Sequence, residues 1–218
     1  MTKLLIALCL LLPLRAQAQD YAPEKTPARV VIVISGASGP GNYQGVAQDV
    51  AKLGYYAVLV DGNAILNRSV GASNLAGTIE RAQGSPKAAP GKVAVLGFSM
   101  GGGGALSFAA PLGDKVATVV AYYPTTSFIG NGMENFVKRF QVPVLVLTGG
   151  QDRYRNCCLV ESMRAMDTAA KARATPFELV VYPDGDHGFN LSGPTYRRDY
   201  DTDAWKRTTE ALRKALAD

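Results

Sequence analysis

Histidine and cysteine are scarce in this chain, which has one histidine and three cysteines in 218 residues. A single histidine argues against a metal site built from imidazoles, because such sites need several nitrogen ligands. Three cysteines, two of them adjacent, do not form the framework of a disulfide-rich fold. The chain also lacks a long basic run, so we interpret its net charge of +5 as basic residues scattered over a solvated surface. We therefore predict no nucleic-acid partner.

The overall composition is that of a folded, single-domain protein. Hydrophobic residues make up 47% of the chain and charged residues 19%, which excludes a disordered protein. The length fits one domain that is large enough to bury a sizeable core. With 23 glycines and 12 prolines there is no collagen-like or low-complexity bias.

Residues 1–18 have the layout of a secretory signal peptide. Lys3 precedes an apolar stretch over residues 4–14, and Ala16-Gln17-Ala18 forms an A-x-A cleavage site. The alternative is a membrane anchor, but the stretch is well short of the ~20 apolar residues of a spanning helix. No later segment is long and apolar enough to span. We therefore expect a single domain over residues 19–218, located in the periplasm or secreted.

Apolar strand-like runs alternate with segments of helical periodicity along the rest of the chain. This alternation predicts an α/β fold with a mostly parallel sheet of about six strands and helices on both faces. Residues 124–141 show no clear strand and are interpreted as a short lid-like excursion. The expected strands are 29–34, 55–60, 92–97, 116–122, 142–148 and 177–182, and the expected helices are 43–53, 71–83, 100–112, 158–173 and 200–217.

Cys157 and Cys158 are the two cysteines that remain after signal cleavage. The favoured interpretation is one buried and one exposed thiol. Adjacent cysteines can bridge only as a strained vicinal ring, because their Cα atoms lie ~3.8 Å apart. That ring, and a disulfide between two chains, are the alternatives.

The pentapeptide at 97–101 reads G-x-S-x-G, with Ser99 at its centre. It follows an expected strand and opens an expected helix, which is the context of a nucleophile elbow. Glycines on either side keep the backbone clear of the tight turn, so the serine hydroxyl is exposed at a helix N-terminus, where negative charge is favoured. The alternative, a phosphate-binding glycine loop, lacks the Lys-Ser/Thr ending of a P-loop.

A serine nucleophile needs a base, and His187 is the only histidine. It follows the last expected strand, at the edge of the sheet where Ser99 lies. Asp152, after the preceding strand, is the favoured acid to orient it, giving the chain order Ser, Asp, His of an α/β-hydrolase. Asp184 and Asp186 are the alternatives, and we expect them to shape the turn instead.

The remaining site residues are expected around this group. The backbone N–H groups of Met100 and, from the loop after the first expected strand, Ala37 are the candidate oxyanion donors. We predict no metal and no cofactor. Aromatic side chains in the strand-end loops either form the walls of the substrate site or belong to the core; these are Tyr122, Tyr123, Tyr154 and Phe189.

These motifs resemble the dienelactone hydrolase family of α/β-hydrolases over about residues 30–216. The resemblance rests on the elbow, on Ala121-Tyr-Tyr123, on Gly149-Gly-Gln-Asp152 and on Asp186-His-Gly-Phe189. It implies a triad at positions 99, 152 and 187, and oxyanion donors at 37 and 100. The elbow with its run of four glycines is also similar to that of cutinase-like polyester hydrolases.

Two positions depart from the family's name-giving enzymes. Those enzymes have a cysteine nucleophile where this chain has Ser99, and a glutamate in the loop after the first strand, where Gly36 aligns. Both departures point away from dienelactone and towards an ordinary ester.

The resulting hypothesis is an exported serine hydrolase that cleaves small or short-acyl carboxylic esters through an acyl-enzyme. A peptidase, thioesterase or polyesterase on the same fold is the nearest alternative, because one machinery serves any acyl transfer. The others are a catalytically silent binding protein and a redox protein that uses Cys157 and Cys158, although C-C is not the C-x-x-C redox motif.

Overall fold

The computed structural model describes residues 18–217. The predicted signal peptide, residues 1–18, therefore lies outside the described residues except for Ala18. Within residues 18–217, no helix combines the length and the apolar character that crossing a membrane requires.

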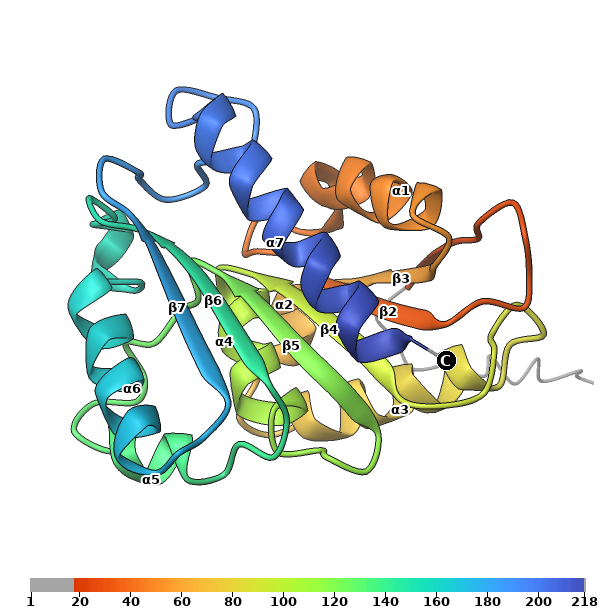
Figure 1. The fold of residues 1–218 in the computed structure, drawn as a ribbon, viewed down its shortest axis with the longest axis horizontal. Helices are drawn as coiled ribbons and strands as arrows, with labels where there is room; N and C mark the ends of the chain where they lie inside the picture. Colours follow the sequence, from red (N-terminus) through yellow and green to blue (C-terminus); the bar gives the residue numbers. More distant parts are fainter. Residues whose placement is uncertain (1–17, 218) are drawn as a thin grey trace, which may run out of the picture.

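One seven-stranded sheet forms the centre of the molecule (Figure 1). Its strand order is β1-β3-β2-β4-β5-β6-β7, and every neighbouring pair is parallel except β1 with β3. The mostly parallel α/β prediction is confirmed, with one strand more than expected. The strands are β1 (Gln19–Tyr21), β2 (Val30–Ile34), β3 (Tyr56–Val60), β4 (Val93–Phe98), β5 (Val116–Tyr122), β6 (Val144–Gly149) and β7 (Phe177–Tyr182).

Helices cover both faces of the sheet, as predicted (Figure 1). On one face, α1 and α7 pack over alternate strand residues such as Val33 and Leu96; on the other, α3, η2 and α6 pack over Ile32 and Val95. The helical elements are η1 (Pro40–Tyr43), α1 (Gln44–Lys52), α2 (Gly62–Ile65), α3 (Gly71–Gln83), α4 (Met100–Gly104), η2 (Ala105–Ala109), α5 (Met133–Val137), η3 (Tyr154–Asn156), α6 (Val160–Ala172) and α7 (Arg198–Leu216).

The central strands are apolar along their whole length because they are covered on both sides. Every residue of β2, β3 and β4 is buried. Parallel pairing brings the carboxyl ends of these strands to one edge, where Ile34 pairs with Gly97 and Phe98 with Tyr122. The loops that follow β2, β4, β5, β6 and β7 therefore meet at this edge.

Three local features differ from the sequence prediction. Strand β1 is short and half-exposed, so no apolar run announces it. The helix expected over 100–112 changes at Ala105 into one turn of π-helix, in which Ala110 N donates to Ala105 O. The segment 124–141 is not a lid: it contains α5, which packs against α6, and Phe136 and Val137 join the core.

The core accounts for stability, and Leu96 at the centre of β4 offers a direct test because it is fully buried. Leu96→Ala should lower the free energy of unfolding by about 2–5 kcal/mol, through lost burial and the cavity left behind. Val70→Ala is the control: that side chain is 44% exposed and should change stability by less than about 0.5 kcal/mol. Urea titrations measure both, and equal effects would contradict the burial described here.

Candidate active site

Ser99 occupies the sharp turn between β4 and α4. Its backbone has φ 50° and ψ −111°, a region that non-glycine residues rarely adopt. Hydrogen bonds hold the turn: Ser99 N donates to Tyr122 O at 2.9 Å, and Gly103 N and Thr125 N donate to Ser99 O at 3.0 and 2.9 Å. The strain at Ser99 is therefore imposed by the strand and helix on either side.

The two glycines of the elbow are sterically required. A Cβ on Gly97 would collide with the backbone of Gly101, and a Cβ on Gly101 would collide with the carbonyl oxygens of Ile34 and Ser35. The next three glycines, 102–104, likewise lie tightly against other segments of the same polypeptide. The expectation that glycines are needed on either side of the tight turn is confirmed.

Three side chains form one hydrogen-bonded chain at the carboxyl edge of the sheet. His187 Nε2 lies 3.0 Å from Ser99 Oγ, and His187 Nδ1 lies 2.8 Å from Asp152 Oδ2. Asp152 is fully buried, and its other oxygen accepts from Tyr154 N at 3.0 Å. When Nδ1–H donates to the carboxylate, the lone pair of Nε2 faces the serine hydroxyl.

The loops that carry Asp152 and His187 hold each other in place. Gly150 N donates to Tyr182 O at 2.7 Å, and Gln151 N donates to Gly185 O at 2.9 Å. These bonds connect the loop after β6 to the loop after β7, so the acid and the imidazole are positioned together.

The structure selects Asp152 over its two alternatives as the partner of His187. Asp186 Oδ1 accepts from the backbone N of His187 at 2.7 Å, which is the turn-shaping role expected of it. Asp184 is exposed. Neither carboxylate forms the hydrogen bond to the imidazole that Asp152 forms.

Of the four aromatic candidates for a substrate wall, one is accessible. Tyr154 is 43% exposed and stacks on the His187 ring, with ring centroids 4.5 Å apart. Tyr123, Tyr122 and Phe189 are at most 1% exposed, which favours the core alternative over the substrate wall for these three. The Tyr123 and His187 rings pack edge to face, with ring centroids 4.7 Å apart. The Tyr122 hydroxyl forms a 2.8 Å hydrogen bond with Thr208 Oγ1 in the core.

The loop after β2 lies beside the serine. An ideal Cβ on Gly36 would stand 3.4 Å from Ser99 Cβ and would collide with the hydroxyl of Tyr43. Ala37 follows in an exposed turn, and its carbonyl oxygen accepts from Asn63 Nδ2 at 3.2 Å. Met100 is the first residue of α4, where an N–H group has no intrahelical acceptor.

Tyr43 is a site residue that the sequence analysis missed. Its side chain is 2% exposed, and burial raises the pKa of its hydroxyl, as it does more strongly for the pKa of Tyr123. Both phenols are therefore neutral hydrogen-bonding groups beneath the site at ordinary pH. No local motif marks Tyr43, because only the fold brings it to Gly36.

Cys157 and Cys158 form a vicinal disulfide. The favoured interpretation of one buried and one exposed thiol was wrong, and the ring that ranked as an alternative is present. Cys158 is fully buried and Cys157 is half-buried. The ring lies in the loop after β6, close to His187.

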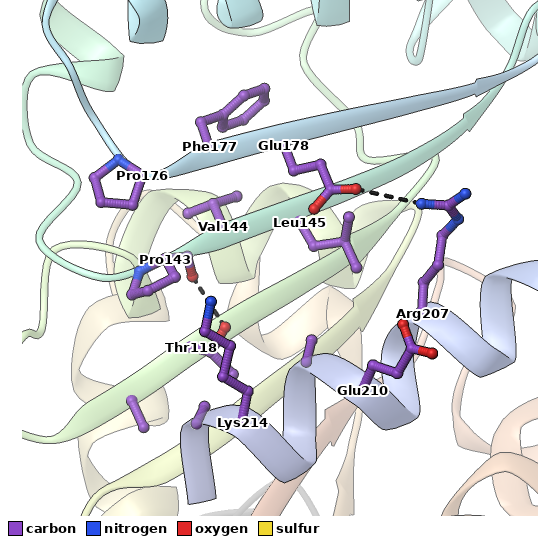
Figure 2. A pocket seen from close by; sticks show the side chains of 13 residues that line it. Thr118, Pro143, Val144, Leu145, Pro176, Phe177, Glu178, Arg207, Glu210 and Lys214 are labelled. Carbon is purple, nitrogen blue, oxygen red and sulfur yellow. Dashed lines mark hydrogen bonds and ion pairs between the residues drawn. The ribbon is translucent and has the colours of Figure 1, made fainter.

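A separate cavity of about 560 Å³ opens between α7 and the first residues of β5, β6 and β7 (Figure 2). Glu178 and Arg207 pair across it at 3.3 Å, both with partly exposed side chains. It lies at the amino ends of the strands, whereas Ser99 lies beyond the carboxyl ends. The cavity is therefore not continuous with the Ser99 site.

The sheet, its helical layers and the strand-turn-helix at Ser99 define an α/β-hydrolase fold. Solved structures agree: a dienelactone hydrolase-like promiscuous phosphotriesterase from metagenomic libraries aligns with a TM-score of 0.76 at 18% identity, covering 92% of both chains. A structure named as a dienelactone hydrolase from Klebsiella pneumoniae aligns with a TM-score of 0.74 at 21% identity, covering 90% of this chain and 92% of that one.

The chain belongs to the dienelactone hydrolase family, whose model matches residues 64–216. Relatives that carry the name carboxymethylenebutenolidase are 33% identical over 122 residues in Yersinia pestis and 34% identical over 127 residues in Salmonella typhimurium. These matches span 53% and 55% of this chain, and 44% and 45% of those relatives. The chain thus covers less than half the length of either relative.

The strained backbone at Ser99 predicts an inverted order of stability between two substitutions. In the middle of a regular helix or strand, a glycine makes the protein less stable than an alanine would, by roughly 0.5–1 kcal/mol. Here Ser99→Gly should be more stable than Ser99→Ala by about 1 kcal/mol, because only glycine tolerates this φ without strain. Chemical denaturation of the two variants measures the difference. A more stable alanine variant would show that the turn is relaxed.

Proposed function

We propose that this protein is an exported serine hydrolase that cleaves small carboxylic esters. The observation that carries the proposal is the continuous hydrogen-bonded chain from Ser99 Oγ through the imidazole to the buried Asp152 carboxylate. Membership of the dienelactone hydrolase family supports hydrolysis as the reaction class.

Each group has a defined part in the proposed reaction. Ser99 Oγ attacks the ester carbonyl while His187 Nε2 takes its proton, and His187 then passes the proton to the leaving alcohol. Asp152 keeps Nδ1 protonated and stabilises the imidazolium. Water, activated by the same imidazole, releases the acid from the acyl-enzyme.

The developing oxyanion is bound by backbone donors. Met100 N–H lies at the start of α4, where the helix dipole favours negative charge. Ala37 N–H is the second proposed donor, since its loop borders Ser99 and its peptide is anchored by Asn63. A donor of this kind contributes about 3–4 kcal/mol to transition-state stabilisation.

The substrate class follows from Gly36. The resemblance to the family's name-giving enzymes aligns this position with a glutamate in those enzymes. Here the Tyr43 hydroxyl fills the space that a side chain at position 36 would need. No carboxylate can stand beside the nucleophile at this position. An ordinary ester with a short acyl group, bound against the exposed Tyr154, fits this arrangement.

The test of this proposal is hydrolysis of short nitrophenyl esters. Ser99→Ala should lower kcat/KM by at least about 1000-fold, and Asp152→Asn by up to about 10,000-fold, because the asparagine favours the wrong imidazole tautomer.

Asp186→Asn is the matched control for the acid. Its side-chain oxygen can still accept from His187 N, so activity should stay within about threefold of wild type. Wild-type activity in Ser99→Ala, or equal losses in the two aspartate variants, would overturn the assignment.

Export is proposed from residues 1–18. Cleavage after Ala18 would leave Gln19, the first residue of β1, at the N-terminus, so the fold described here would be kept whole. Expression of the full chain in a Gram-negative host, with cell fractionation and N-terminal sequencing, should find a mature protein beginning at Gln19 in the periplasm or medium. Uncleaved protein confined to the cytoplasm would contradict the proposal.

A further inference from the structure

The vicinal disulfide stands directly beside the imidazole of His187. A ring nitrogen of His187 and the two sulfur atoms of Cys157 and Cys158 all lie within 4.8 Å of one another. In the bridged form the sulfurs are not metal ligands, because neither carries a thiolate charge. Reduction would turn the same three side chains into two thiols and one imidazole, which is a set of soft and borderline ligands.

The distances suit a thiophilic cation. Zinc binds thiolate at ~2.3 Å and imidazole at ~2.0–2.1 Å, so ligand atoms on a tetrahedron lie roughly 3.5–3.8 Å apart. The two sulfurs, bonded to each other in the oxidised form, would have to move apart after reduction to reach this separation. The imidazole nitrogen, now at most 4.8 Å from either sulfur, would have to approach them by about 1 Å at most.

The backbone would keep the sulfurs in place after reduction. Cys157 O accepts from Thr126 N at 2.8 Å and from Ser127 N at 3.1 Å, while Cys157 N donates to Tyr154 O at 3.0 Å. Cys158 Sγ also lies 3.7 Å from Thr125 Oγ1. None of these contacts depends on the S–S bond, so the two thiols would remain at His187.

The imidazole is already prepared as a ligand. Its Nδ1 is paired with the Asp152 carboxylate at 2.8 Å, which is the second-shell arrangement that orients metal-binding histidines. The lone pair left free is that of Nε2, the same one that faces Ser99. A metal ion that takes this lone pair would therefore compete with the serine proton for one nitrogen. Solvent can reach the cluster, since His187 has a 14% exposed side chain and Cys157 is half-buried.

We propose that the dithiol form of Cys157 and Cys158, together with His187, is a binding site for a thiophilic divalent cation such as Zn²⁺, and that its occupancy stops hydrolysis. A dithiol reductant supplies two electrons and two protons to the disulfide and is itself oxidised to a disulfide. The cation then displaces the two thiol protons and takes the Nε2 lone pair. The inhibitory effect rests on the proposed function; the metal site does not.

The test compares the reduced and oxidised protein. Wild type is reduced with a phosphine and freed of reductant under anaerobic conditions. Equimolar Zn²⁺ should then lower ester hydrolysis at least about tenfold, with recovery on adding a chelator. The oxidised wild type should keep its activity at the same Zn²⁺ concentration, and so should reduced Cys157→Ser/Cys158→Ser, which lacks both sulfur ligands. Zinc inhibition that does not depend on the redox state would overturn the proposal.

A second measurement keeps metal binding separate from hydrolysis. Reduced Ser99→Ala, which retains all three ligands, should show thiolate-to-cobalt charge-transfer absorption on addition of Co²⁺. His187→Gln in the same background should weaken Co²⁺ binding by about 10-fold or more. No such absorption in reduced Ser99→Ala would overturn the site even if the esterase is active, whereas an inactive wild type with the absorption present would overturn the proposed function alone.

Discussion

The tight turn between β4 and α4 is the constraint on which the site depends. Ser99 is held at φ 50° because its N–H and carbonyl form hydrogen bonds to the end of β5, to the loop after it and to α4. Gly101 lies against the end of β2, and Gly97 lies against Gly101. No side chain fits at Gly97 or Gly101. The hydroxyl is thereby presented at one edge of the sheet. The two loops that carry the acid and the imidazole reach the same edge because β6 and β7 run parallel to β4.

Several neighbouring side chains position the imidazole ring of His187. The buried Asp152 fixes one ring nitrogen, Tyr154 covers one ring face and Tyr123 supports an edge. The other nitrogen faces Ser99, with the vicinal disulfide close by. The imidazole that faces Ser99 is therefore also the one that lies near the two sulfur atoms, so the proton transfer and the metal binding proposed above would exclude each other.

Much of this arrangement could be predicted from the sequence because continuous apolar runs mark strands buried on both faces, and strand-end loops of a parallel sheet meet at one edge. The strand β1 could not be predicted, since its three half-exposed residues pair only with β3. Burial of Tyr122 and Phe189 could not either, because an aromatic at the end of a strand or in the loop after it can face the core or the solvent. The Cys157–Cys158 bridge depends on a loop conformation that spacing does not determine.

The most direct test of the central claim is to find where an acyl-site reagent binds covalently. Treating the intact protein with a fluorophosphonate and mapping the modified peptide by mass spectrometry reports which side chain is the nucleophile. The account predicts one phosphonyl group on the Ser99 hydroxyl, and no labelling once His187 is replaced by glutamine. Labelling at another residue, or none in the folded wild type, would contradict it.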